Sequence, residues 1–138
     1  MKTVLFACVH NAGRSQMAAA FFNRLADHAR VLAISAGTEP GERVHPVVVE
    51  VMREAGIDLS SAQPRKLTGD LASRANLLVT MGCGEACPVV PGVERDDWPL
   101  DDPKGRALPE VRAIRDAIEA RVQQLLAARG WSRPAPVS

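Results

Sequence analysis

The first 25 residues constrain the fold most strongly, because their hydrophobic pattern changes abruptly. Residues 2–7 form a short apolar run rich in β-formers, and residues 8–14 follow without any periodicity. From Ser15 onward, Met17, Phe21 and Leu25 recur every four positions, as they would on one face of a helix. The pattern predicts a strand, a tight loop and a helix in succession.

The rest of the chain continues this alternation. Residues 76–81 are almost continuously apolar, which is typical of a parallel strand buried on both faces. We therefore expect an α/β fold, a three-layer sandwich in which helices flank a four-stranded parallel sheet. Further strands are expected at 31–37, at 76–81 and near Trp98, and helices at 46–55, 67–74 and 109–129, with Gly56 and Gly130 as stop signals.

The length of 138 residues suits one compact domain. We expect residues 1–130 to form that domain and residues 131–138, which contain two prolines, to form a flexible C-terminal tail. Residues 82–97 carry several glycines and prolines without periodicity, so we expect a long loop there. Loops of that length in small domains are usually functional or mobile.

Charge and composition exclude several classes of partner. The chain has 17 basic and 16 acidic residues, a net charge of +1, so neither a nucleic-acid nor a membrane surface is expected. The N-terminal apolar run is too short for a signal peptide, and no stretch is long enough to span a bilayer. We expect a cytoplasmic monomer. Its three cysteines then favour chemistry over a structural disulfide framework.

The first loop pairs Cys8 with Arg14 across five intervening residues. Peptide N–H groups in such a loop can surround an anion, and the helix N-terminus adds positive charge that favours a thiolate. Arg14 offers a planar fork for two oxygens of a tetrahedral ion. Asn11 tolerates a left-handed conformation and Gly13 permits close approach, which outweighs the alternative of a buried strand end and a solvated arginine. The candidate oxyanion site comprises Val9, His10, Asn11, Ala12, Gly13, Arg14 and Ser15, with no catalytic role for His10.

A second candidate is Asp101-Asp102-Pro103. A thiolate that displaces oxygen from the centre of a tetrahedral oxyanion needs a proton donor for the leaving group. Neighbouring carboxylates near an anion favour protonation of one of them. From these residues alone, an ordinary Asp-Pro turn is an equal alternative.

The third candidate is the pair Cys83 and Cys87, which could lie on adjacent turns of a helix and approach disulfide distance. Reduction of a bound oxyanion takes two electrons, and a dithiol that becomes a disulfide supplies two. No dinucleotide fingerprint is present, and no cofactor is expected. The alternatives are inert thiols or half of a zinc site. Zinc is disfavoured because the remaining ligands would be three scattered histidines, His10, His28 and His45.

The string Cys8-Val9-His10-Asn11-Ala12-Gly13-Arg14-Ser15 resembles the signature loop of the low-molecular-weight protein tyrosine phosphatase fold. The continuation Gln16-Met17-Ala18 is similar to arsenate reductases on that fold. Cys87-Pro88, Trp98 and Asp101-Asp102-Pro103 are similar to thioredoxin-coupled arsenate reductases. The resemblance implies that Asp102, more than Asp101, is the general acid and that Ser15 helps to hold the Cys8 thiolate.

The resulting hypothesis is reduction of arsenate to arsenite, with phosphate and sulfate as analogues of the substrate. Thiol exchange would run from Cys8 to Cys83 to Cys87, and thioredoxin would reset the pair. Some relatives bind potassium through an acidic residue early in the first helix. Residues 18–20 are alanines, so no metal site is carried over. Relatives that use mycothiol or glutathione need no internal cysteine pair.

Two other functions stay open at this point. A phosphatase acting on phosphotyrosine or small phosphate esters would need only Cys8, Arg14 and Asp102 and would leave the cysteine pair unused. The chain has no Tyr and few aromatic residues to wall a phosphotyrosine slot, although Trp98 could serve. The other alternative is a non-catalytic oxyanion-binding or redox-sensing module.

Overall fold

The computed structural model describes residues 1–82 and 90–134. Its four strands form one parallel sheet in the order β2-β1-β3-β4, which confirms the predicted α/β architecture. The elements in chain order are β1 (Lys2–Cys8), α1 (Arg14–Leu25), β2 (Val31–Gly37), α2 (Pro46–Glu54), α3 (Gly69–Ser73), β3 (Leu77–Thr80), β4 (Glu94–Asp97) and α4 (Leu108–Arg129).

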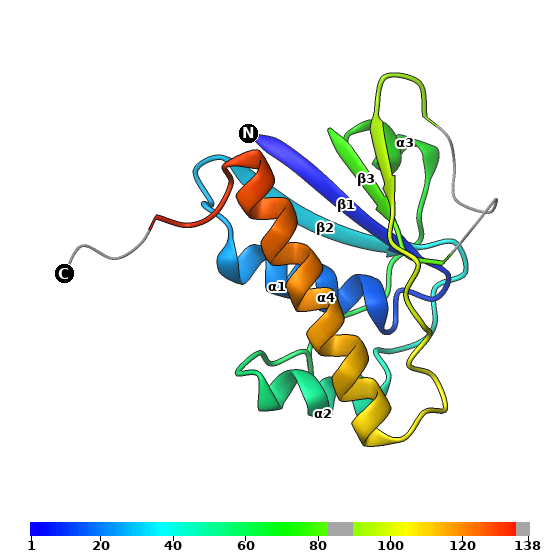
Figure 1. The fold of residues 1–138 in the computed structure, drawn as a ribbon. Coiled ribbons are helices and arrows are strands. Elements are labelled where there is room, and N and C mark those ends of the chain that lie inside the picture. The colour runs from blue at the N-terminus through cyan, green and yellow to red at the C-terminus, as the bar shows by residue number, and fades with distance from the viewer. Residues whose placement is uncertain (83–89, 135–138) are drawn as a thin grey trace.

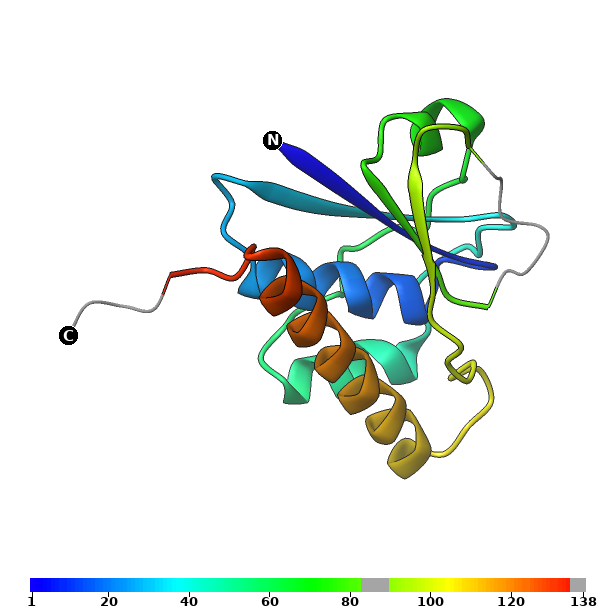
Figure 2. The same cartoon turned by 45° about the horizontal axis from the view of Figure 1, so that its top comes forward.

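The central strand β1 divides the core in two. Val4, Phe6 and Cys8 face a large cluster made with α1, α2 and α4, whereas Leu5 and Ala7 face a smaller cluster beside α3. This alternation follows from the two-residue period of a strand. Figures 1 and 2 show the three longer helices together on one face of the sheet and α3 on the other. The result is a three-layer sandwich.

Helix boundaries follow the signals in the sequence. Pro46 and Pro109 lie in the first turns of α2 and α4, where the missing N–H costs no helical hydrogen bond. Gly130 follows α4 in the left-handed conformation (φ 70°), and Gly56, two residues after α2, also has positive φ (82°). The side chain of Thr68 caps α3 by accepting a hydrogen bond from the Leu71 N–H at 3.0 Å.

The last strand differs from expectation. β4 lies at Glu94–Asp97, inside the segment predicted to be a loop, and it ends just before Trp98. All four of its residues are charged, so no apolar pattern marks it. As the edge of the sheet it needs only the backbone pairing with β3, and charged residues are common on such edges.

Residues 131–133, at the start of the segment expected to form a tail, make backbone contacts with the end of α1 and the residues that follow it. The Trp131 carbonyl accepts a hydrogen bond from the Asp27 N–H at 2.7 Å, and the Arg133 N–H donates to Leu25 at 2.8 Å. The Trp131 ring lies edge-on to Phe22, with 6.3 Å between ring centroids. The aromatic contact explains why the chain stays on the helices beyond Gly130. Residues 135–138 lie outside the described part.

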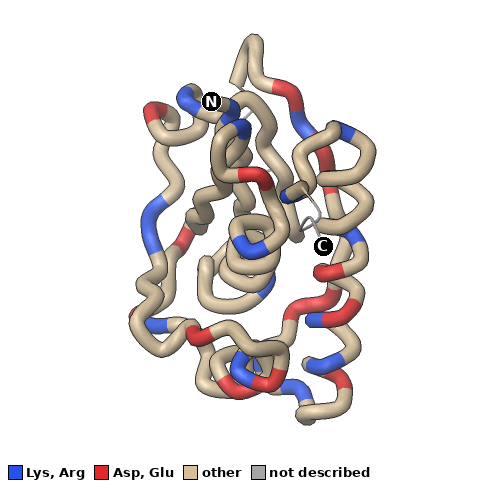
Figure 3. Tube along the Cα trace, turned by 90° about the vertical axis from the view of Figure 1, so that its left-hand side faces the viewer, with Lys and Arg blue, Asp and Glu red and all other residues tan. Residues whose placement is uncertain are grey.

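Basic and acidic residues are interspersed along the trace, and neither sign occupies one side alone (Figure 3). Such a surface offers no single-sign field to gather an anion from a distance. Among the described helices, none combines the length and apolar character that a membrane crossing requires. Binding of an anion must therefore depend on local geometry.

Candidate active site

The loop between β1 and α1 lies at the carboxyl end of the central strand. Ligands bind at this end in parallel sheets, because the loops of neighbouring strands converge there. The end of β2 supports the loop closely. A Cβ at Gly37 would lie 2.6 Å from the Val9 carbonyl oxygen and 2.8 Å from the Asn11 nitrogen. Gly37 is therefore required for the backbone of the loop to pack against β2.

The Cys8 sulfur is enclosed by the loop, with only 2% of the residue exposed. Its Sγ lies 2.8 Å from the Ser15 hydroxyl and accepts a hydrogen bond from the Asn11 N–H at 3.3 Å. The structure thus places Ser15 and Asn11 around the candidate nucleophile.

Asn11 braces the loop from the inside. It has the left-handed conformation that its residue type permits (φ 50°), and it is fully buried. Its Nδ2 donates to the Ser15 hydroxyl at 2.7 Å, and its Oδ1 accepts from the Arg65 N–H at 3.0 Å. One side chain therefore joins the loop to the distant segment before α3.

Arg14 opens α1 and is only 8% exposed, unusually little for an arginine. Its Nη1 donates to the Leu100 carbonyl at 3.1 Å, and its Nη2 lies 3.8 Å from an Asp102 carboxylate oxygen. From the other side, a Cβ at Gly82 would lie 2.2 Å from Nη1. The guanidinium thus lies between the backbone after β3 and the loop that carries Asp102.

The loop that carries Asp102 rests on the first loop. A Cβ at Gly13 would lie 2.8 Å from Pro103 Cγ, so the two loops are in direct contact. The Asp102 carboxylate accepts the Lys104 N–H at 3.0 Å, and its backbone carbonyl accepts Arg106 Nε at 2.8 Å. About half of the Asp102 side chain is exposed. A proton on this carboxyl could therefore exchange with solvent.

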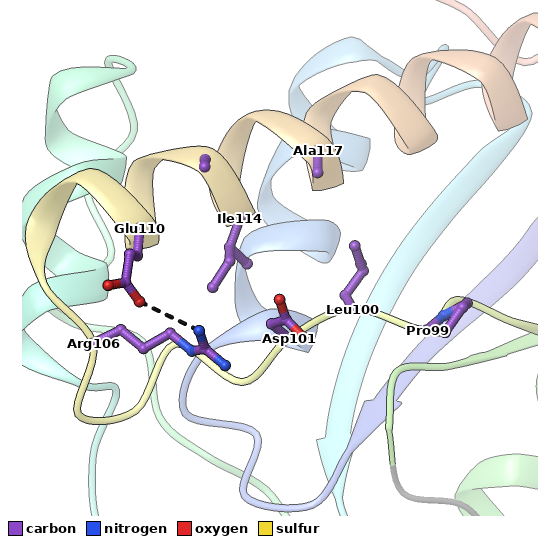
Figure 4. A pocket seen from close by; sticks show the side chains of 8 residues that line it. Pro99, Leu100, Asp101, Arg106, Glu110, Ile114 and Ala117 are labelled. Carbon is purple, nitrogen blue, oxygen red and sulfur yellow. Dashed lines mark hydrogen bonds and ion pairs between the residues drawn. The ribbon is translucent and has the colours of Figure 1, made fainter.

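Asp101, the other carboxylate of this motif, lies in a different environment from Asp102. It helps to line a surface hollow of about 410 Å³ between this loop and α4. Figure 4 shows the apolar wall of Leu100 and Ile114 and the ion pair that joins Arg106 to Glu110 at 3.3 Å. Cys8 does not line this hollow. Of the two carboxylates in the Asp101-Asp102-Pro103 motif, Asp102 is the one placed beside Arg14.

Two histidines border the first loop. His10 bonds through Nδ1 to the Glu39 carbonyl at 2.9 Å, which ties the loop to the segment after β2. His45, just before α2, donates its backbone N–H to Ala12 at 2.9 Å. Burial lowers the pKa of the His45 imidazole, an effect that the nearby Asp102 carboxylate opposes and that Lys104 and His10 reinforce.

Several residues of the site were not anticipated from the sequence. His45, Gly37, Gly82 and the Leu100 carbonyl all contact the loop or Arg14 from other parts of the chain. Gly37 and Gly82 carried a usable signal, because each stands at or just after the carboxyl end of a strand next to β1. Cys83 and Cys87 lie outside the described residues. Residues 1–82 and 90–134 contain no cluster of three or more His, Cys, Asp or Glu that could hold a metal.

Comparison with known proteins places this geometry in a family. Residues 3–131 match the family described as low molecular weight phosphotyrosine protein phosphatase. A putative arsenate reductase of Halobacterium salinarum is 44% identical over 126 residues, which cover 87% of each chain.

Solved structures agree with this assignment. The thioredoxin-dependent arsenate reductase of Corynebacterium glutamicum is 38% identical with a TM-score of 0.80; the match covers 93% of this chain but only 61% of that longer one. An arsenate reductase in the phosphate binding state is 31% identical with a TM-score of 0.76, covering 93% of this chain and 98% of its own. With the matched residues running through nearly all of the described structure, the chain belongs to the low molecular weight phosphotyrosine protein phosphatase family.

Proposed function

We propose that this protein is an arsenate reductase. Cys8 would attack arsenate held by the amides of residues 9–15 and by Arg14, and a relay from Cys8 to Cys83 to Cys87 would carry the electrons. Thioredoxin would reduce the resulting disulfide. We further propose that the protein acts as a cytoplasmic monomer, with residues 1–130 as one domain.

The first half of the reaction is supported by the surroundings of Cys8. A sulfur with two hydrogen-bond contacts, beside the N-terminus of a 12-residue helix, is well placed to face an anion. In this step the Cys8 sulfur bonds to arsenic and one arsenic–oxygen bond breaks. Asp102, beside Arg14, supplies the proton with which that oxygen leaves as water.

The second half of the reaction changes the oxidation state of arsenic. The Cys83 thiolate attacks the Cys8 sulfur, and the electron pair of the sulfur–arsenic bond stays on arsenic, which leaves as arsenite. Cys87 then attacks Cys83 and releases Cys8 as a thiolate. The sum is one arsenic(V) reduced to arsenic(III) and two thiols oxidised to one disulfide. An external dithiol restores the starting state.

Two contacts just before Cys83 support the proposal that these cysteines act on Cys8. Gly82, which immediately precedes Cys83, packs so closely on Arg14 that a Cβ there would lie 2.2 Å from Nη1. The N–H of the preceding residue, Met81, donates to the carbonyl of Ala7 at 2.7 Å, and Ala7 is the residue before Cys8. The chain therefore enters the Cys83 segment at the loop of the candidate nucleophile.

The alternative phosphatase activity receives less support. A phosphotyrosine slot would need an exposed aromatic wall, and Trp98 is the residue that the sequence offered for it. Trp98 is only 3% exposed and packs on Phe6 with 5.5 Å between ring centroids. It belongs to the core, so it is not available to a substrate ring.

The decisive experiment couples the purified protein to thioredoxin, thioredoxin reductase and NADPH, and follows NADPH consumption on addition of arsenate. We expect consumption that depends on arsenate and disappears in Cys8→Ser. Hydrolysis of para-nitrophenyl phosphate is measured in parallel. Efficient ester hydrolysis without arsenate-dependent consumption would favour the phosphatase instead.

A further inference from the structure

Gln16 is a buried polar side chain that does not belong to the oxyanion loop. It lies in the first turn of α1 and is only 8% exposed. A primary amide is costly to bury unless its hydrogen bonds are made. Its Nε2 donates to Asn11 Oδ1 and to the Gln63 backbone carbonyl, each at 3.2 Å. Gln16 therefore joins three segments: the oxyanion loop, α1 and the chain before α3.

These contacts determine which way the Asn11 amide points. Asn11 Oδ1 receives two donors, Gln16 Nε2 and the Arg65 N–H, which together use both of its lone pairs. If the Asn11 amide were flipped, its NH₂ group would face these two donors. The oxygen is thus held toward Gln16 and Arg65, and the NH₂ group is held toward Ser15.

The orientation of the Asn11 amide determines which atom donates in the hydrogen bond between Ser15 and Cys8. Because Asn11 Nδ2 donates to the Ser15 oxygen at 2.7 Å, the hydroxyl hydrogen of Ser15 is free to point elsewhere. The Cys8 sulfur lies 2.8 Å from that oxygen and is the acceptor in reach. The hydrogen bonds thus all point toward the sulfur. Gln16 and Arg65 donate to Asn11. Asn11 in turn donates to Ser15, and Ser15 donates to the sulfur.

We infer that Gln16 is a positioning residue for the Cys8 thiolate, acting through Asn11 and Ser15 without touching the substrate. This inference rests on the proposed function only in taking Cys8 as the nucleophile. Loss of the Gln16 donor leaves Asn11 Oδ1 with one partner, in a residue already held in the left-handed conformation. Ser15 then points its hydrogen at sulfur for a smaller fraction of the time.

The test measures the reactivity of the sulfur itself. In a Cys83→Ser, Cys87→Ser background Cys8 is the only cysteine of the full chain, so its alkylation by iodoacetamide can be followed directly. Gln16→Met keeps the length but removes the donor. We expect it to slow alkylation about fivefold, the change that the loss of one ordinary hydrogen bond brings.

Gln16→Glu gives a sharper signature. A carboxylate there would face two acceptors, Asn11 Oδ1 and the Gln63 carbonyl, and should slow alkylation more than Met does at neutral pH. Protonation would restore one donor, so its rate relative to the Gln16 protein should recover as pH falls. Gln124→Glu, at an exposed position on α4, controls for the added charge and should match the Gln16 protein at every pH.

Thermal unfolding of each variant separates positioning from folding. The inference is overturned if Gln16→Met alkylates at the unchanged rate whatever its melting temperature, or if Gln16→Glu shows no recovery on acidification. Failure of arsenate reduction is a separate result. If the wild-type protein does not turn over arsenate while the alkylation rates follow this order, the proposed reductase is rejected and the role of Gln16 stands.

Discussion

An alanine at position 82 would bring its Cβ to 2.2 Å from Arg14 Nη1, well inside any tolerated contact. The Arg14 guanidinium is the movable partner, but its Nη1 also donates to the Leu100 carbonyl at 3.1 Å. Gly82→Ala must therefore displace the group that we assign to the oxyanion. The backbone at Gly82 also has φ +93°, which adds strain for any side chain.

Gly92 provides a matched control for that strain. Its φ is +83°, but a Cβ there would meet nothing within 4 Å. A residue other than glycine in such a conformation costs roughly 1–3 kcal/mol. Both alanine variants should lose stability within that range in urea unfolding. The displacement of Arg14 should occur only in Gly82→Ala.

Phosphate binding measured by calorimetry then separates the two effects. A hydrogen bond from a charged donor is worth about 1.5–3 kcal/mol, so a misplaced guanidinium should weaken binding by about tenfold to a hundredfold. Gly92→Ala should bind phosphate like the wild type. If Gly82→Ala bound phosphate as tightly as the wild type, the close approach of residue 82 to Arg14 would have no effect on the oxyanion site. If both variants lost phosphate affinity equally, the loss would come from backbone strain and not from the displacement of Arg14.

Three further predictions concern the acid, the relay and pH. Asp102→Asn should lower kcat for arsenate without weakening phosphate binding. Arg106→Gln, which removes the 2.8 Å hydrogen bond to the Asp102 carbonyl, should lower kcat less, by about tenfold or less. If steady-state assays found kcat unchanged in both variants, Asp102 would have no part in the mechanism. Cys83→Ser should stop thioredoxin-coupled turnover but leave phosphate affinity intact, and sustained turnover would contradict the relay. Because burial lowers the pKa of His45 in the folded protein, the unfolded chain binds a proton at this imidazole more readily, and the free energy of unfolding should fall as pH drops below 6.5. In urea melts, the free energy of unfolding of His45→Gln should depend less on pH. The same pH dependence in the variant and the wild type would contradict this assignment.

Local patterns in the sequence were sufficient for much of the fold. The short apolar run at residues 2–7 and the four-residue spacing that follows it identified β1 and α1, and proline and glycine marked both ends of α4. The charged strand β4 left no such signal, because its place depends on pairing with β3. Residues 131–133 dock through an aromatic contact with Phe22, and such a contact follows from the folded arrangement.

From the sequence, we could predict the residues of the candidate site that lie in one continuous segment. Cys8, Arg14 and Ser15 lie within one loop and helix start, so their spacing carries information. The approach of Gly82 to Arg14 and of Pro103 to Gly13 joins parts of the chain far apart in sequence. These contacts depend on the order of strands in the sheet, which spacing alone does not reveal.

The central claim is that oxyanion chemistry at Cys8 passes its electrons to the Cys83–Cys87 pair. A single-turnover experiment tests it most directly: fully reduced protein is mixed with excess arsenate and no external reductant, arsenite is quantified, and the cysteines are mapped by mass spectrometry. We predict one arsenite per protein, a disulfide between Cys83 and Cys87, and Cys8 recovered as a free thiol. Arsenite released with all three thiols still reduced, or no arsenite at all, would contradict the account.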